Sequence, residues 1–216
     1  MAFWDFITGR AGRDDRDPRE RGAKLDGAMA AIHDVIETIK DMPGQEPQDP
    51  LPLLLPRDPL DFHGLPIVWR VHLPQREAVY MGIGRAPAGE EYDRKRYVVI
   101  VQSVLFYAAW RAADLALHAD RTRALLPSDI PTDYKWSGQG PNWTGGRRNP
   151  VYLPDVGYHP SRGPAFVDGV TRSLWLVYNG ATSFPVAVSG KESAQGLYAL
   201  AGDPRTKPES IHALSS

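Results

Sequence analysis

The chain has 216 residues, 24% of them charged, a formal net charge of −1 and no cysteine. This length is typical of one domain with a sizeable core. The charge balance gives no sign of binding to nucleic acid or to an anionic membrane, and the lack of cysteine excludes disulfides, thiolate catalysis and cysteine metal sites. The N-terminus lacks the basic start and apolar run of a signal peptide, which predicts a cytoplasmic protein or a part of an intracellularly assembled particle.

Residues 1–22 are predicted to form an N-terminal arm. Phe3, Trp4 and Phe6 lie close together, and a charge-dense stretch follows at residues 12–22. Exposed aromatic side chains are unfavourable unless something covers them, so the pattern fits an aromatic anchor on a tether that docks into a neighbour. A frayed terminus with a solvated charge run is the alternative.

Residues 23–42 are predicted to form an amphipathic helix, because large apolar side chains recur at helical spacing. These side chains are Leu25, Met29, Ile32, Ile36 and Ile39. Prolines then recur through residues 43–66 and favour an extended connector laid across the core, in preference to a ligand for a proline-binding domain.

Two short alternating runs, residues 67–73 and 78–84, are separated by four residues and predict a β-hairpin. Residues 96–126 are predicted to form the central helix of the fold. The first half of that segment is apolar on nearly every side, which is typical of a buried helix. Its uncharged part, residues 97–110, is too short to span a bilayer.

Residues 127–166 combine many prolines and glycines with aromatic side chains, and predict a long irregular loop that needs a surface to lie on. Residues 170–178 and 184–189 predict a second hairpin around Asn179 and Gly180, with Pro185 favouring an edge position for the return strand. Residues 193–201 fit a short helix or a strand, and residues 202–216 a loose tail.

The expected fold is therefore α+β, with antiparallel hairpins packed on a long buried central helix. Residues 23–201 form its single domain. The N-terminal arm and the long irregular loop extend outside this domain, and the tail follows it.

Few residues suggest chemistry. Asp58, Asp61 and His63 lie close together on a turn-rich segment, where two carboxylates and an imidazole suit acid–base work or a divalent cation. The nearby prolines also explain both aspartates as ordinary turn residues. Asp114 and His118 are four residues apart on the central helix, a spacing that suits two metal ligands or a helical hydrogen bond. No motif supplies a third ligand or a nucleophile, so no cofactor is expected.

These features together favour a structural or assembly protein, a homo-oligomer or a subunit of a larger, virion-like protein complex that grips neighbours through its arm and its loop. The interface side chains would be Phe3, Trp4, Phe6, Trp136, Trp143, Tyr152 and Tyr158. Two alternatives stay open. One is a metal-assisted hydrolase that uses the Asp/His cluster, and the other is a binding module whose pocket is lined by the two tryptophans of the loop.

Overall fold

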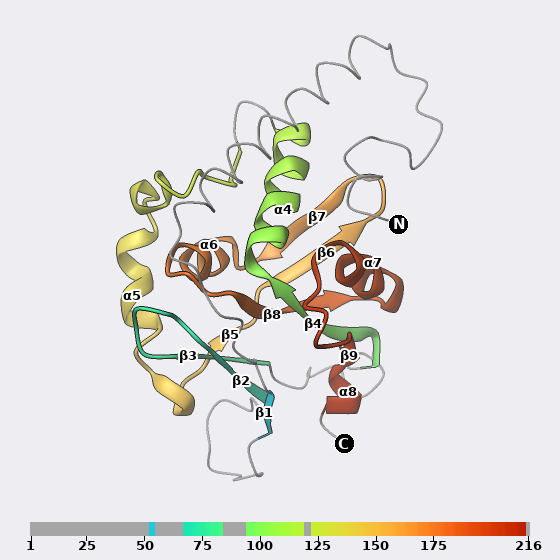
Figure 1. Ribbon diagram of the computed structural model, residues 1–216, viewed down its shortest axis with the longest axis horizontal. Coiled ribbons are helices and arrows are strands. Elements are labelled where there is room, and N and C mark those ends of the chain that lie inside the picture. Colours follow the sequence, from blue (N-terminus) through green and yellow to red (C-terminus); the bar gives the residue numbers. More distant parts are fainter. Residues whose placement is uncertain (1–51, 55–66, 84–93, 119–121, 215–216) are drawn as a thin grey trace.

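The computed structural model describes residues 52–54, 67–83, 94–118 and 122–214. Within these ranges the chain forms two β-sheets with helices against them, a mixed α+β architecture (Figure 1). The sequence predicted this class correctly. The predicted arm, the amphipathic helix at 23–42 and most of the proline-rich connector lie outside the described residues.

The smaller sheet has the strand order β1-β2-β3-β5. Strands β2 (Ile67–Val71) and β3 (Val79–Ile83) form the predicted hairpin, with Trp69 opposite Met81. Strand β1 (Pro52–Leu54) pairs antiparallel with β2, and β5 (Val151–Tyr152) pairs parallel with β3. Trp69 and Met81 are buried, as the alternation of apolar and polar side chains requires.

The larger sheet has the order β7-β6-β8-β4-β9. Its long central strands are β4 (Arg96–Gln102) and β8 (Ser183–Ser189), which pair antiparallel over seven residues. Strand β6 (Asp155–His159) is parallel to β8, and β7 (Gly163–Asp168) closes one edge. Strand β9 (Glu209–Ser210) lies at the other edge, beside β4.

The expectation of one helix over residues 96–126 is wrong at both ends, because the first seven residues form β4 and residues 118 and 122–126 lie beyond the helix and are not helical. Val98, Val99, Ile100 and Val101 are β-branched and buried, and such a continuous run suits a strand covered on both faces. Helix α4 (Ser103–Leu117) begins directly after the strand. The apolar side chains of α4 therefore do recur at helical steps, but the apolar run in the sequence also includes the preceding strand β4.

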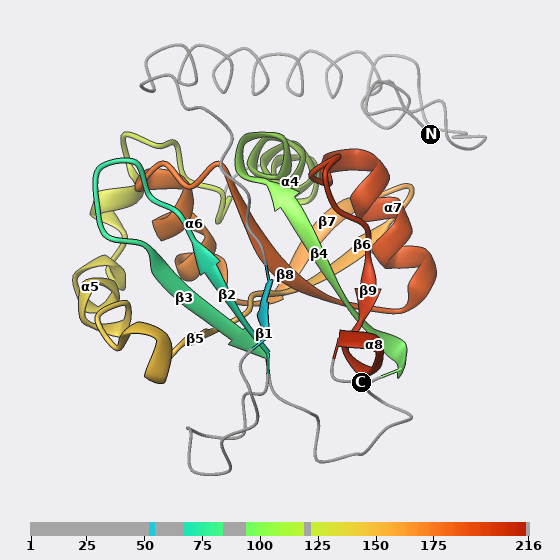
Figure 2. The same cartoon turned by 60° about the horizontal axis from the view of Figure 1, so that its bottom comes forward.

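Helices α4 and α7 (Lys191–Ala201) lie side by side on the larger sheet (Figure 2). Phe106 of α4 contacts Phe166 and Phe184 edge to face, with ring centroids 5.6 and 5.9 Å apart. Trp110, one turn later, contacts Phe166 at 4.7 Å. These aromatic side chains form the centre of the core between α4 and the sheet.

The second predicted hairpin is also wrong, because residues 170–178 form helix α6 (Val170–Tyr178). Asn179 and Gly180 end this helix, and Gly180 has φ 76°, the left-handed conformation common after a helix C-terminus. The turn signal was genuine, but it marks a helix end.

The expected edge position of residues 184–189 is wrong as well, because β8 lies between β6 and β4. The backbone N–H of Ala187 donates to the carbonyl of Pro154, so alternate nitrogens of β8 point toward β6. The backbone nitrogen of Pro185 also points toward β6, but β6 pairs only with Ala187 and Val188 of β8. The proline therefore costs no hydrogen bond of the sheet.

Much of the predicted loop at 127–166 is ordered into short elements, in addition to β5, β6 and β7. They are η1 (Ile130–Thr132), η2 (Trp136–Gly138), α5 (Gln139–Asn142) and η3 (Gly146–Arg148). The segment predicted as a loose tail contributes β9 and α8 (Ile211–Leu214), and Ile211 is fully buried. Both segments are parts of the domain because they bury apolar side chains.

Candidate functional site

The junction between β4 and α4 holds the strongest group of buried polar side chains that the structure describes. Gln102 ends the strand with φ −72° and ψ 119°, and its side chain does not cap the helix. The backbone N–H of Ser103 donates to the carbonyl of Thr182 at 2.9 Å. The Ser103 side chain is 1% exposed, and its hydroxyl has no hydrogen-bond partner among the described residues.

Asp203 lies against this junction. Its backbone N–H donates to the carbonyl of Ile100 at 2.9 Å, which places it beside β4. Its carboxylate accepts from Nε and Nη2 of Arg205 at 2.9 and 2.6 Å, and from the hydroxyl of Ser183, the residue opposite Gln102. The Arg205 hydrogen bond is the main cause that lowers the pKa of Asp203, against a smaller opposing effect of burial. Asp203 is therefore a buried, paired carboxylate.

This junction suits a hydrogen-bond acceptor or a negative group better than a metal ion. The first turn of α4 presents backbone N–H groups without acceptors inside the helix, at the positive end of its dipole. The Ser103 hydroxyl adds a donor, whereas the Arg205 cation is already paired with the Asp203 carboxylate. The Asp203 oxygens are already engaged, and the described residues contain no group of three His, Asp or Glu side chains that could hold a metal.

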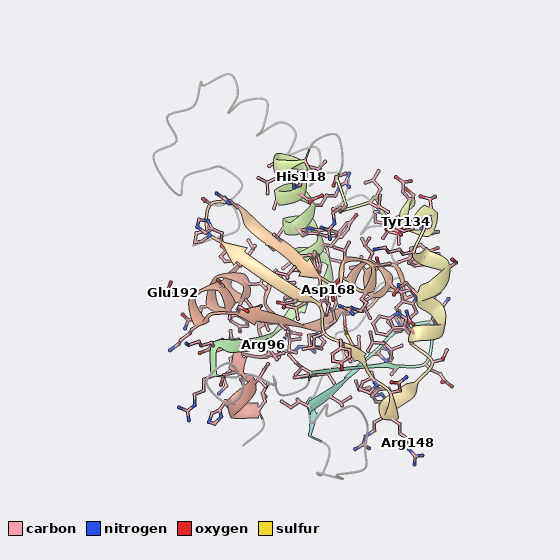
Figure 3. The ribbon with its side chains drawn as sticks, turned by 180° about the vertical axis from the view of Figure 1, so that it is seen from behind. Arg96, His118, Tyr134, Arg148, Asp168 and Glu192 are labelled. Atoms are coloured by element: carbon pink, nitrogen blue, oxygen red, sulfur yellow. The ribbon has the colours of Figure 1, made fainter. Side chains whose placement is uncertain are left out.

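Asp114 and His118 are not brought together as a metal pair within the described residues. The Asp114 carboxylate accepts from the Thr122 hydroxyl at 2.8 Å and from the Arg123 backbone N–H at 2.6 Å. His118 is exposed at the end of α4 (Figure 3). The proposed ligand Asp114 instead ties the segment after α4 to the helix.

Two further side chains of α4 also bind the segment that follows the helix. Arg111 donates to the carbonyl of Ala124, and the Tyr107 hydroxyl donates to the carbonyl of Leu125. Positions 107, 111 and 114 share one side of the helix, so this side holds the Thr122 hydroxyl and the backbone of the next three residues, 123–125. Burial raises the pKa of Tyr107 to about 12, and its hydroxyl is therefore a neutral donor at ordinary pH.

The predicted interface aromatics fall into separate places. Trp143 is 7% exposed and stacks on Trp175, while Trp136 is partly buried and contacts Tyr178 edge to face at 4.8 Å. Tyr158 packs at α7, and Tyr152 is 53% exposed. Phe3, Trp4 and Phe6 lie outside the described residues, as do Asp58, Asp61 and His63. A role of these residues in an interface or in catalysis stays a prediction.

Sequence reasoning missed Ser103, Ser183, Asp203 and Arg205. One signal was present: the β-branched run ends at Val101, and alanines with high helix propensity recur from Ala108. A change in the spacing of apolar side chains, from that of a strand to that of a helix, marks the boundary between two elements at this serine. Nothing local shows that Asp203, a hundred positions further along the chain, lies beside it.

The part of the chain that the structure describes contains no helix long and apolar enough to cross a membrane. A protein-family model described as plasmid fertility inhibition factor matches residues 98–202. This range runs from β4 through α7 and includes Ser103 and Ser183, but ends just before Asp203.

Protein osa of Shigella flexneri is 31% identical to this chain over 132 residues, which cover 59% of the chain and 65% of that relative. The alignment thus spans slightly less than two thirds of the relative. A crystal structure of Oncogenic Suppression Activity Protein, described as a plasmid fertility inhibition factor, has a TM-score of 0.66 and 26% identity. That likeness covers 87% of this chain and 92% of the other, and it confirms the mixed α+β fold.

These comparisons contradict the function that the sequence favoured and its hydrolase alternative. The matching family model and the similar solved structure are described as plasmid fertility inhibition factors, so the expectation of a structural subunit of a virion-like assembly is wrong, and so is that of a metal-assisted hydrolase. Proline, glycine and aromatic residues in long segments suggested extended contacts with neighbours. In the structure, much of that composition serves tight turns and the chain's own core.

Proposed function

We propose that this chain is a plasmid fertility inhibition factor, a protein that lowers the conjugative transfer of a plasmid from the bacterial cell that contains it. The observation that carries the proposal is the likeness to the solved fertility inhibition factor over most of both chains, at 26% identity. The family-model match at residues 98–202 also supports it. The place of action would be the cytoplasm of the donor cell.

A mating assay tests this proposal. Donor cells that carry a conjugative plasmid receive the chain on a second, compatible plasmid, and transconjugants per donor are counted against an empty-vector control. A panel of conjugative plasmids from different groups is used so that the test does not depend on one transfer system. We expect transfer of at least one plasmid to fall. Unchanged transfer of every plasmid in cells that contain the folded chain would overturn the proposal.

The β4–α4 junction is the part of the fold on which we expect inhibition to depend. A buried hydroxyl without a partner costs stability, so a merely structural Ser103 should be replaceable by alanine at no cost. We expect Ser103→Ala to keep or raise the melting temperature while it weakens inhibition of transfer.

Ser173→Ala is the matched control for this variant. Ser173 in α6 is likewise buried, and its hydroxyl also has no partner among the described residues. We expect this variant to retain full inhibition. If Ser103→Ala also retains full inhibition, the junction is not the functional site, whereas the mating assay with the unaltered chain still decides the function itself.

A further inference from the structure

The outer face of the smaller sheet carries basic and aromatic side chains. Arg70 of β2 is the register partner of Tyr80 of β3, so the two side chains lie on the same face. Tyr152 of β5 is the partner of Gly82, two positions after Tyr80, and therefore shares that face. Trp69, next to Arg70 along the strand, is buried on the opposite face, against the core.

The turn η3 adds two arginines beside this face. Because β5 is parallel to β3, the residues before β5 run along the first part of β3, and η3 contacts that strand. Arg147 and Arg148 are both exposed, and Figure 3 shows Arg148 at the edge of the molecule. Figure 2 shows β2 and β3 on the near side, with no described helix in front of them. The arginine–tyrosine surface consists of Arg70, Tyr80, Arg147, Arg148 and Tyr152.

This surface is positively charged, and one of its rings is open to solvent. Residues 67–83 and 146–152 contain 4 Arg against 1 Glu, a net charge of +3. No ion pair between described residues involves its three arginines. Tyr152 is 53% exposed, since Gly82 beside it has no side chain to cover the ring. Single exposed arginines are common, but three of them beside two tyrosines form a patch with the composition of an interface.

We propose that the arginine–tyrosine surface binds an acidic segment of a partner protein. Arginine and tyrosine are among the residues that contribute most to the binding energy of protein interfaces. The positive charge selects a segment rich in aspartate and glutamate and speeds the encounter with it. A nucleic acid strand fits less well, because it is bound through a long line of phosphate contacts that needs more cations than three. On the function proposed above, on which this step rests, the partner is a protein of the conjugative transfer apparatus.

Fluorescence anisotropy with the full-length chain tests the proposal. The probe is a fluorescein-labelled peptide of three Glu-Leu-Glu-Ser repeats, and a labelled single-stranded oligonucleotide of the same number of units is measured beside it at physiological salt. We expect the peptide to bind, and the triple variant Arg70→Glu, Arg147→Glu, Arg148→Glu to weaken its binding at least about tenfold, because attraction becomes repulsion. Each variant is first checked for an unchanged far-ultraviolet circular dichroism spectrum and melting temperature.

The matched control is the triple variant Arg123→Glu, Lys191→Glu, Lys207→Glu. It makes the same change in net charge at exposed positions outside the smaller sheet, and should weaken peptide binding less than about twofold. An equal loss in both triple variants would show attraction by overall charge alone and overturn the proposal, as would the absence of peptide binding. Tighter binding of the oligonucleotide through the same three arginines would assign the surface to nucleic acid and overturn it too.

The mating assay separates this proposal from the function itself. If the unaltered chain lowers plasmid transfer, the surface variant should lose inhibition and the control variant should keep it. Full inhibition by the surface variant would overturn a role of this surface in docking on the transfer apparatus. If the unaltered chain does not lower transfer, the proposed function fails, whereas the anisotropy measurement still decides whether the surface binds an acidic segment.

Discussion

The indole rings of Trp143 and Trp175 are stacked, with their centroids 4.6 Å apart and their planes at 15°. Trp143 belongs to the segment after α5, and Trp175 to α6, so this contact joins an irregular segment to the sheet domain. The guanidinium of Arg76, from the turn between β2 and β3, lies 5.8 Å from the Trp175 ring centroid. Three separate parts of the chain therefore meet at Trp175.

We expect Trp143→Ala to lower the free energy of unfolding by about 3 to 5 kcal/mol, because it removes a large buried side chain and leaves a cavity. Chemical denaturation measured by far-ultraviolet circular dichroism checks this. Trp136→Ala is the matched control, since Trp136 is only partly buried. If the two variants lose the same stability, the stacked pair has no special role in the fold.

The second prediction concerns a close approach between α7 and β6. A Cβ atom on Gly196 would lie 2.3 and 2.6 Å from two ring carbons of Tyr158, so Gly196→Ala should cost about 1 to 3 kcal/mol through overpacking. In a Tyr158→Ala background the same change should stabilise α7 by up to about 1 kcal/mol, because alanine has the higher helix propensity. A double-mutant cycle of unfolding free energies measures this change of sign. Additive effects would contradict the packing described.

The third prediction concerns alkaline pH. Burial raises the pKa of the Tyr107 hydroxyl from 10.0 to about 12, so its neutral form is favoured in the folded state. This contribution to stability is complete below pH 10 and is lost as the pH rises toward 12, and at 1.36 kcal/mol per unit it amounts to about 3 kcal/mol. Tyr107→Phe should flatten the alkaline part of the stability profile. Tyr134→Phe, at an 84% exposed position, should leave it unchanged.

The fourth prediction concerns acid. The pKa of Asp203 is held below its ordinary value of 3.8 by Arg205, so the carboxylate contributes stability above pH 3.8 that is lost as the pH falls below it. Asp203→Asn should lower stability at neutral pH and reduce the slope of stability against pH in the acid range. Urea unfolding from pH 2 to 7 checks both effects. An unchanged acid slope would show that the pair with Arg205 contributes nothing.

Local patterns predicted elements well where one residue period continued to the end of an element. The hairpin of β2 and β3 and the body of α4 were found because their apolar side chains alternate or recur at helical steps. Strand β4 was missed because a fully buried strand is apolar at every position and can be mistaken for a buried helix. Helix α6 was missed because Trp175 and Val177 have strand propensities that tertiary burial overrides.

The β4–α4 junction could not be predicted because its side chains come from three distant parts of the chain. Ser103, Ser183 and Asp203 meet only once β4, β8 and the segment after α7 are paired. The candidates that the sequence did suggest were neighbours along the chain. Asp114 shows the difference, because its carboxylate finds its partners in Thr122 and Arg123, beyond the end of its own helix.

Strand β8 supplies the middle of the larger sheet, yet it lies about eighty positions after its partner β4. A chain that is being synthesised cannot close this sheet until β8 has left the ribosome, about eighty residues after β4 has emerged. Until then the β-branched side chains of β4 have no partner strand and are open to mispairing with other nascent chains. We therefore expect the yield of folded protein in cells to depend on chaperones that protect β4 until β8 emerges.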